Sequence, residues 1–397
     1  MNSLHHCLRL PLLTFLTLAL GFGPPQHDCL ADNHTARKHH GRSPSTFLHG
    51  VTQPLLASKA NENKLNVSVF RLRHDGGFAR VQLRDYPIPP TFGYALTVRF
   101  LTASPDGRFL FAECDNTADG RYAPLFLQYR ILPDGQLKPY DRVAIVPGST
   151  HLVFHPSGRY AYLSCADQSS AQTQPGRVVQ VRVTPEGDLL YPPVASIPCG
   201  PMPTALTLDR QGRVGAVLDA ETGFLWQYTL TAQGRLSPCS PPQVAVAKDF
   251  VAPLMTWEGQ SAYVSSQGRH QRYRIYQLRR RAGGGFSLLM PWAVRVPDVI
   301  YSMTISNRHR AIYVSSGVRL SSFQVGPQGA LRPTSFTLKT GVSVNMAVDE
   351  ESDLLYASGL NNTLRVYRIH GSGLLTALHA SPARACSWMD SLTIVRR

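Results

Sequence analysis

Lysine is scarce in this chain, and charged residues of both signs are few. Charged side chains make up 16% of the residues, with 40 basic against 25 acidic ones and a formal net charge of +15. Lysine occurs only at Lys38, Lys59, Lys64, Lys138, Lys248 and Lys339, so the positive charge is almost entirely arginine. Arginine forks bind oxyanions well. These arginines are scattered along the chain, which favours an arginine-rich surface over a dedicated anion site.

Several signatures of chemistry are also missing. The sequence has no C-x-x-C pair or zinc spacing, no G-x-S-x-G nucleophile elbow, no P-loop and no dinucleotide-binding glycine pattern. The sequence therefore predicts neither a metal site nor a cofactor.

One apolar run stands out, near the N-terminus. The stretch "LPLLTFLTLALGFG" (10–23) is too short for a membrane span and is followed by "CLA" (29–31), which offers small residues for a signal peptidase. We predict a signal peptide over 1–31, a disordered leader over 32–49 and an exported protein, periplasmic or extracellular, with no transmembrane span after cleavage. A retained N-terminal anchor is the alternative.

The cysteines limit the possible disulfides. Five would remain after cleavage at Ala31, namely Cys114, Cys165, Cys199, Cys239 and Cys386, and an odd number excludes complete internal pairing. A Cys114–Cys165 disulfide stays open, because the two occupy one position of a repeat.

Turn residues are abundant, with 31 Gly and 30 Pro, and they recur with a period. One half of the repeat is a turn and a strand, as in "SPDGRFLFAEC" (104–114), "HPSGRYAYLSC" (155–165) and "SNRHRAIYVSS" (306–316). The other half is a hairpin around a Gly, as in "LFLQYRILPDGQLKPY" (125–140). Seven such hairpins, about 45 to 60 residues apart, predict an all-β fold, a seven-bladed β-propeller over 50–397.

The ends of the chain predict how the ring closes. The first hairpin (64–81) is preceded by "PLLAS" (54–58), which reads like the end of the second strand of a blade, and it lacks a first strand. The chain ends in "SWMDSLTIVRR" (387–397), which reads like the first strands "SMTIS" (302–306) and "ALTLD" (205–209). We expect the C-terminal strand to complete the N-terminal blade, which would remove open sheet edges.

The stretch from Gly148 to Cys165 resembles a family segment. The "F-x-P-x-G-R-Y-x-Y" units, the hairpins and the terminal closure resemble the lactonase-type seven-bladed propellers, which include 6-phosphogluconolactonase-like and muconate-lactonising enzymes. The matching residues are Gly148, His151, Phe154-His155-Pro156 and Tyr160-Ala161-Tyr162. The resemblance implies a lactone hydrolase. Thr150, Cys165 and Ala166 depart from it, because the family has Arg, Asn and Glu there.

The repeat predicts which residues line the central funnel. The positions equivalent to His151 are Phe100, Ala205, Pro253, Ser302, Asn345 and Ser391, and each preceding residue forms a second column, namely Arg99, Thr150, Thr204, Ala252, Tyr301, Val344 and Asp390. A metal-free lactonase needs a general base near neutral pKa and groups that stabilise an oxyanion. We therefore predict His151 as base with Asp115 orienting it, and Arg99, Asn345, Tyr301 and Asp219 as ligand-binding residues.

Structural interpretations of the same residues stay open. His151 can be a partly buried polar residue at the funnel mouth, and Arg99 can form a seam ion pair with Asp390. His155 corresponds to Ser104, Asp209, Ser306 and Asp349 in the other copies, which indicates turn chemistry. On a strand, residues four apart lie about 13 Å apart, so His151 and His155 cannot share a metal ion.

The sequence is compatible with two candidate functions and disfavours a third. The first is an exported module that binds a ligand or a protein at its funnel face, and the second is a metal-independent lactone hydrolase acting on a sugar-derived lactone. We expect a lactone, a sugar acid or a protein as the partner, and a monomer. The basic stretch "RHQRYRIYQLRRRAGGG" (269–285) alternates like a half-exposed strand, so nucleic acid or an anionic cell surface is the disfavoured partner.

Overall fold

The computed structural model describes residues 46–52, 64–73, 78–87, 96–116, 125–145, 148–166, 175–246, 254–258, 260–268, 272–282, 284–316, 319–339, 343–359, 363–378, 383–384 and 389–396. All of them lie in the compact unit Pro44–Arg397. Within these ranges the chain forms only strands and turns, and no helix long and apolar enough to cross a membrane is found. The all-β expectation is confirmed.

The described strands pair into seven antiparallel sheets, each with its strands in chain order except where the termini meet. The first sheet joins β29 (Met389–Arg396), β1 (Thr46–Thr52), β2 (Lys64–Leu72) and β3 (Phe78–Pro87). The second has β4 (Leu96–Ala103), β5 (Phe109–Asn116), β6 (Leu125–Ile131) and β7 (Leu137–Ile145). The third has β8 (Ser149–Phe154), β9 (Tyr160–Cys165), β10 (Arg177–Val183) and β11 (Leu189–Pro198).

The remaining four sheets repeat this pattern. They are β12 (Pro203–Leu208), β13 (Val214–Asp219), β14 (Phe224–Leu230) and β15 (Leu236–Ala245), then β16 (Leu254–Glu258), β17 (Ser261–Gly268), β18 (Arg272–Arg280) and β19 (Phe286–Arg295). Next come β20 (Ile300–Ser306), β21 (Ala311–Ser316), β22 (Arg319–Val325) and β23 (Leu331–Lys339). The last sheet has β24 (Ser343–Asp349), β25 (Leu354–Gly359), β26 (Thr363–Ile369) and β27 (Leu375–Ala377), with β28 (Ala383–Arg384) also on β26.

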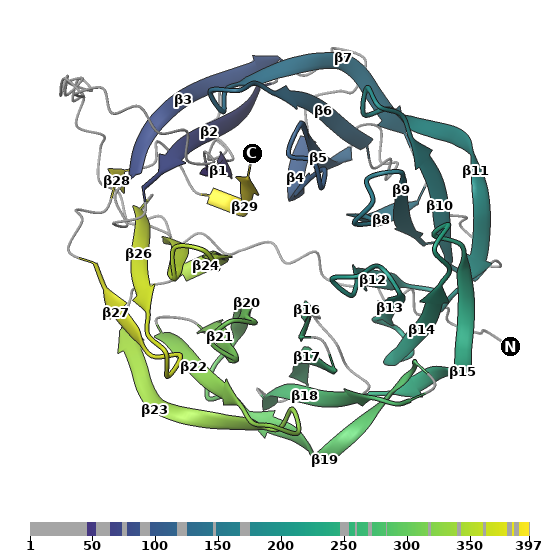
Figure 1. Ribbon diagram of the computed structural model, residues 1–397, viewed down its shortest axis with the longest axis vertical. Coiled ribbons are helices and arrows are strands. Elements are labelled where there is room, and N and C mark those ends of the chain that lie inside the picture. The colour runs from purple at the N-terminus through teal and green to yellow at the C-terminus, as the bar shows by residue number, and fades with distance from the viewer. Residues whose placement is uncertain are drawn as a thin grey trace, which may run out of the picture. The chain divides into compact units, whose positions relative to one another are not determined.

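The inner strands of these sheets contact one another in a cycle, which is the geometry of a propeller. The contacts run from β4 to β8, β12, β16, β20, β24 and β29, and from β29 back to β4. Figure 1 shows these strands nearest the middle and β3, β7, β11, β15, β19 and β23 outermost. The all-β propeller prediction is confirmed.

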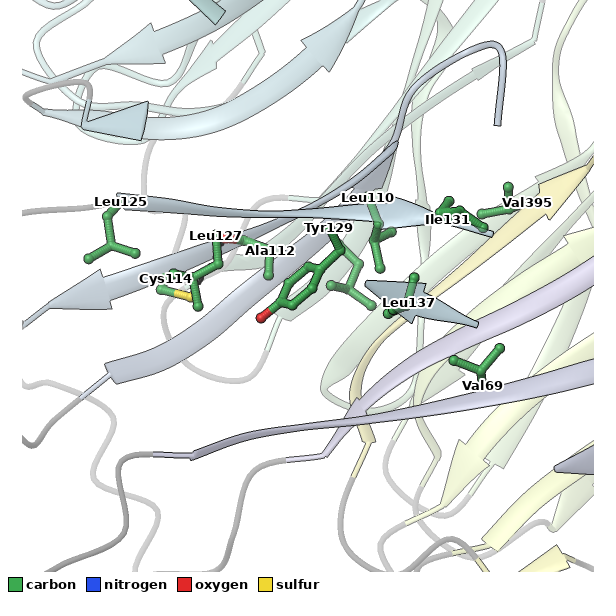
Figure 2. Packing of buried hydrophobic residues seen from close by; sticks show 11 residues of the cluster. Val69, Leu110, Ala112, Cys114, Leu125, Leu127, Tyr129, Ile131, Leu137 and Val395 are labelled. Carbon is green, nitrogen blue, oxygen red and sulfur yellow. Dashed lines mark hydrogen bonds between the residues drawn. The ribbon is translucent and has the colours of Figure 1, made fainter. Parts of the chain in front are cut away.

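The C-terminal strand β29 pairs with β1, with Phe47 opposite Val395. Val395 is 2% exposed and packs with Val69 and with the sheet β4–β7, where Figure 2 shows it beside Ile131. The neighbouring Ile394 packs with Tyr356 of the sheet β24–β27. Because successive side chains of a strand point to opposite faces, β29 contacts a neighbouring sheet on each side.

The partner of the first hairpin differs from the predicted segment. We expected "PLLAS" (54–58) beside it, but the strand paired with β2 is β1, which lies earlier in the chain. Residues 53–63 lie outside the described ones. The first strand also begins at Thr46, inside the predicted leader of 32–49.

Three of the interfaces between neighbouring sheets carry a repeated polar contact as well as an apolar core. A Tyr in the second strand of the sheet donates its hydroxyl to a hairpin Gly carbonyl of the next sheet. The Tyr263 hydroxyl lies 2.8 Å from the Gly329 oxygen, and the Tyr313 hydroxyl lies 3.1 Å from that of Gly373. Tyr162 makes the same bond to Gly234. The repeat is therefore specified by contacts between sheets and not by the strand pattern alone.

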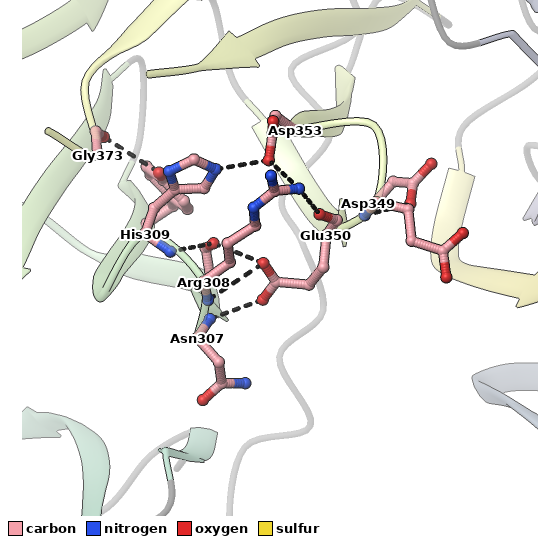
Figure 3. Close-up of polar contacts among 10 residues, drawn as sticks. Asn307, Arg308, His309, Asp349, Glu350, Asp353 and Gly373 are labelled. Carbon is pink, nitrogen blue, oxygen red and sulfur yellow. Dashed lines mark hydrogen bonds and ion pairs between the residues drawn. The ribbon is translucent and has the colours of Figure 1, made fainter. Parts of the chain in front are cut away.

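A charged cluster joins the sheets β20–β23 and β24–β27 at the turns that follow their inner strands (Figure 3). The Glu350 carboxylate accepts the Ser306 hydroxyl at 2.8 Å and the Asn307 amide at 2.6 Å. Asp353 accepts His309 Nε2 at 2.7 Å and pairs with Arg308 at 3.1 Å. These contacts join the end of β20 and the turn after it to the turn after β24, so the cluster stabilises the packing of two neighbouring sheets.

Candidate functional site

A β-bulge recurs at one register position of the inner strands. The pairing skips a residue at Arg99 of β4, Thr150 of β8, Thr204 of β12, Tyr301 of β20 and Asp390 of β29, and it skips Val344 and Asn345 together in β24. These are the residues that the sequence places in the column before His151. Bulges re-aim side chains and concentrate beside active sites. The candidate site is therefore the ring of inner-strand residues around these bulges.

The pairing also corrects one position of the His151 column. His151 lies opposite Ser164, and the equivalent Ser265 lies opposite Leu254. The sequence repeat aligns Pro253 with His151, but the shorter turn after β16 moves the register by one residue. Residues 252 and 253 lie outside the described part of the chain.

His151 lies where two sheets meet. It is half-buried on β8, and its ring meets the edge of the Phe100 ring of β4, with centroids 4.9 Å apart and planes at 88°. Phe100 occupies the same column in the neighbouring sheet, as the sequence predicts. An imidazole that keeps part of its surface and packs on an aromatic ring can exchange a hydrogen bond or a proton with a ligand.

Glu113 is an acidic residue beside this pair, and the sequence-based prediction missed it. Glu113 of β5 lies directly opposite Phe100 of β4, and it is only 2% exposed. Opposed residues of an antiparallel pair share a face of the sheet. Glu113 and Phe100 are therefore on one face of the sheet. This face is turned towards His151, because the Phe100 ring contacts the His151 ring. The signal was available, because a carboxylate between Ala112 and Cys114 interrupts an apolar strand and charged residues are seldom buried without a role.

Cys165 lies close enough to Glu113 for the carboxylate to act on its thiol. Burial raises the pKa of the Cys165 thiol to about 12, and the Glu113 carboxylate adds to the shift. Cys165 is on β9, so the carboxylate acts across the boundary between the sheets β4–β7 and β8–β11. Cys114 and Cys165 are both buried as thiols. The disulfide that the sequence leaves open does not join them, and Cys386 lies outside the described residues.

Asp115, the predicted partner of His151, is two residues beyond Glu113 on β5, opposite Thr97. Residues two apart on a strand share a face, so the backbone places Asp115 on the same face as Glu113. The side chains of Asp115 and Arg99 are not described. Arg99 lies on β4 and Asp390 lies on β29, and these two strands are in contact. The predicted ion pair between Arg99 and Asp390 requires this contact.

The turn before β8 is held by close backbone contact. Gly148 has φ +73°, and a Cβ atom there would lie 2.2 Å from the Ala166 carbonyl oxygen. The Ala166 amide donates to the Gly148 oxygen at 2.8 Å. Ser149 follows, fully buried, and its hydroxyl has no hydrogen-bond partner in the described part of the chain. Only glycine fits at position 148, and the turn places Ser149 and His151 at the boundary between the sheets.

Asp219 has a structural position. Its carboxylate has no exposed surface and accepts the amides of Met202 at 2.8 Å and Glu221 at 3.3 Å. The amide and hydroxyl of Thr222 also donate to it. A buried carboxylate with several donors joins two loops, so this placement favours a role in the loops over direct contact with a ligand.

Tyr301 and Asn345 lie at the bulges of β20 and β24, and both are half-buried. The backbone of Asn345 is tied to the Ser358 hydroxyl, with its amide donating at 3.1 Å. These residues come from other sheets than His151, and only their place at the bulges of the inner strands connects them with it.

His155 is bound into its turn. Its Nδ1 lies 2.8 Å from the Ser157 hydroxyl, and its Nε2 lies 3.2 Å from the carbonyl oxygen of Gly212 in the next sheet. The interpretation as turn chemistry agrees with these contacts. Among the described residues, no three His, Cys, Asp or Glu side chains are grouped to hold a metal ion.

Comparison with known proteins identifies relatives by structure alone. No protein-family model and no curated protein sequence matches the chain. A provisional 6-phosphogluconolactonase of Bacteroides fragilis superposes with a TM-score of 0.67 at 15% identity, covering 89% of this chain and 98% of that one. The periplasmic gluconolactonase of Pseudomonas aeruginosa superposes with a TM-score of 0.64 at 17% identity, covering 89% and 99%. At such identities the likeness shows the fold, and this chain has the propeller fold of lactonase-like proteins.

Proposed function

We propose that this protein is an exported propeller that binds a small sugar acid or lactone at the inner ends of its strands, around His151. The recurring bulge carries this proposal. If the bulges served only to close the ring, they would not have to lie at the same register position in each inner strand. They coincide with the column that holds Arg99, Thr150 and Tyr301, each of which directly precedes a residue of the His151 column.

The boundary between the sheets β4–β7 and β8–β11 offers suitable chemistry for such a ligand. Phe100 supplies an apolar surface, and sugars pack their C–H faces on aromatic rings. His151 offers a donor or an acceptor, and Ser149 adds a buried hydroxyl whose hydrogen bonds are still to be made. A ligand site with a few convergent polar groups beside an aromatic ring is typical of small-molecule pockets.

A lactone hydrolase is the second candidate, and Glu113 favours it. Water would add to the lactone carbonyl as His151 takes one of its protons, the ring C–O bond would then break, and the ring oxygen would receive a proton. Asp115 or Glu113 would keep the imidazole basic and oriented. The names of the two lactonase-like neighbours agree with this chemistry, whereas Thr150, Cys165 and Ala166 depart from the family pattern at the positions of Arg, Asn and Glu.

The proposal includes a seven-bladed ring closed by the C-terminal strand and a site outside the cytoplasm. The seven described sheets and the β1–β29 pairing support the first. The apolar run at 10–23 and the periplasmic location in the name of one neighbour support the second. A protein ligand at the same face is the remaining variant of the binding role.

Titration calorimetry with gluconolactone and gluconate tests the binding proposal. We expect one site per chain, weakened about tenfold or more in His151→Ala and in Phe100→Ala, because each removes a wall of the site. His370→Ala is the matched control, since His370 is exposed in the β26–β27 turn and contacts Thr376. No heat with either compound, or equal binding in His151→Ala and His370→Ala, would refute the proposal.

Hydrolysis is measured separately on the same variants. If the chain is a hydrolase, gluconolactone opens faster than spontaneously, and His151→Ala removes the excess rate. Binding without rate enhancement assigns the site to recognition alone.

A further inference from the structure

A second surface lies on the two outer strands of the sheet β16–β19, β18 and β19, across the sheet from its inner strand β16. We call it the rim patch and define it by Arg274, Tyr276, Leu288, Met290, Trp292 and Arg295. The Trp292 ring stacks on the Tyr276 ring, with centroids 5.6 Å apart and planes at 20°. The Arg274 guanidinium carbon lies 5.4 Å from the centre of the Trp292 ring. Trp292 is thus held in one orientation by an aromatic and a cationic neighbour.

The rim patch exposes apolar side chains whose exposure is not needed to form the sheet. Met290 is 76% exposed, Trp292 is 40% exposed, and Leu288 is exposed beside them on the same strand. The strand β19 is the last of its sheet, so these side chains lie at its open edge. Exposed Trp and Met side chains gathered beside an Arg are characteristic of binding surfaces.

The charge around the patch has one sign. The segment 272–296 contains no Asp or Glu, and Arg279, Arg281 and Arg295 are exposed within it. The outer strand β11 shows the contrast, since it also exposes Tyr191 and Val194 but follows a hairpin with Glu186 and Asp188. The residues that define the rim patch are therefore apolar, aromatic or basic, whereas the hairpin before the equivalent edge two sheets away contributes acidic residues.

We propose that the rim patch docks an acidic protein segment that carries an apolar side chain. The acidic side chains would pair with Arg274 and Arg295, and the apolar side chain would lie against Trp292 and Met290. An arginine stacked on an aromatic ring is pre-oriented, which suits the planar, bidentate recognition of a carboxylate. Pro291 has no amide hydrogen to offer in the middle of β19, so the segment is held by side chains more than by strand addition.

The observations favour a protein over the other anionic partners. A lipid surface needs apolar side chains and positive charge but no fixed stacking geometry. A nucleic acid strand would need several aromatic platforms along a groove, and Trp292 is the single exposed ring of this patch. The fixed Arg274–Trp292–Tyr276 arrangement fits one carboxylate next to one apolar group.

Fluorescence anisotropy with the full chain tests this inference. The probe is a labelled peptide of Glu, Asp and Ser around one Phe, with a second peptide in which Ser replaces the Phe. We expect the first peptide to bind at low salt, to bind less at high salt because screening weakens the ion pairs, and to bind more tightly than the second. Trp292→Ala and Arg274→Ala should each weaken binding about fivefold or more, while Trp292→Phe keeps most of it.

The control variant is Tyr191→Ala, which removes an exposed aromatic ring from the outer edge of β11. It should leave binding unchanged, and circular dichroism melting should show all variants folded. The inference is overturned if the peptide does not bind, if Trp292→Ala binds as well as the wild type, or if Tyr191→Ala loses as much. It is also overturned if only phosphatidylglycerol vesicles or single-stranded DNA bind in a Trp292-dependent way.

Discussion

Neighbouring residues of β8 and its flanking turns have different roles although they look alike in the sequence. His155 has both ring nitrogens engaged within the turns, while His151 keeps exposed surface against Phe100. Gly148 is demanded by geometry, because its φ is positive and the Ala166 carbonyl is close. Resemblance to a family segment cannot separate these roles, since all three residues match the pattern equally.

The Gly148 contact predicts a specific loss of stability. Gly148→Ala should lower the free energy of unfolding by about 2 kcal/mol or more, because the new Cβ atom meets both a left-handed backbone and a carbonyl oxygen. Gly158→Ala is the control, since Gly158 has φ +70° and a Cβ atom there would meet nothing within 4 Å. It should cost about 1 kcal/mol. Urea unfolding measures both, and an equal or reversed order would contradict the close contact.

The buried thiols predict a chemical property. Cys114, Cys165, Cys199 and Cys239 are buried and in no disulfide, and burial raises the pKa of Cys165 and Cys199. Thiolates are the reactive species, so these groups should be inert in the native protein. In a chain with Cys7, Cys29 and Cys386 changed to Ser, a thiol reagent should label four groups only after unfolding. Rapid labelling of the native chain would show that the boundary around Cys165 opens.

At the scale of strands, the sequence predicts the hairpins and the inner columns because both follow from period-two alternation and from turns rich in Gly. It does not predict the bulges, because each lies within the first few residues of its strand, where too few residues precede it to show a shift in the alternation. Glu113 was missed for a related reason, since the candidate acids were sought at strand ends. The error at Pro253 arose from a shortened turn, which a fixed register cannot accommodate.

Removing one of the tyrosine contacts between sheets should lower the free energy of unfolding modestly. Tyr263→Phe removes a hydroxyl that donates to Gly329 at 2.8 Å inside a fully buried site. The unpaired carbonyl should lower the free energy of unfolding by about 1 kcal/mol. Tyr191→Phe is the control, because that ring is 54% exposed on β11. Chemical denaturation that shows no difference between the two variants would contradict a stabilising role for the repeated contact.

At the scale of the whole propeller, the first and the last of the described strands pair with each other in one sheet. The strand β29 pairs with β1 and packs on both neighbouring sheets through Val395 and Ile394. The pairing of β29 with β1 therefore joins residues that lie far apart in the sequence, such as Phe47 and Val395. The sequence predicts closure by this strand because the first hairpin lacks an inner strand, and closure stays a proposal that the β1–β29 pairing supports.

Closure by β29 predicts that a short C-terminal change destabilises the entire ring. Val395→Asp should cost more than about 3 kcal/mol, because it buries an unpaired charge between two sheets. Val395→Ala should cost about 2 kcal/mol by leaving a cavity. Thermal melting and gel filtration measure the loss of stability and any association through the freed edge of β1. A melting temperature unchanged in Val395→Asp would contradict closure by this strand.

The central claim is that the inner column around His151 holds a small sugar acid or lactone. A crystal structure of the chain grown with gluconate tests it most directly. The account predicts the ligand within hydrogen-bond distance of the His151 ring and against the Phe100 ring, at the boundary between β4 and β8. Gluconate bound elsewhere, or an inner column without it at saturating concentration, would contradict the account.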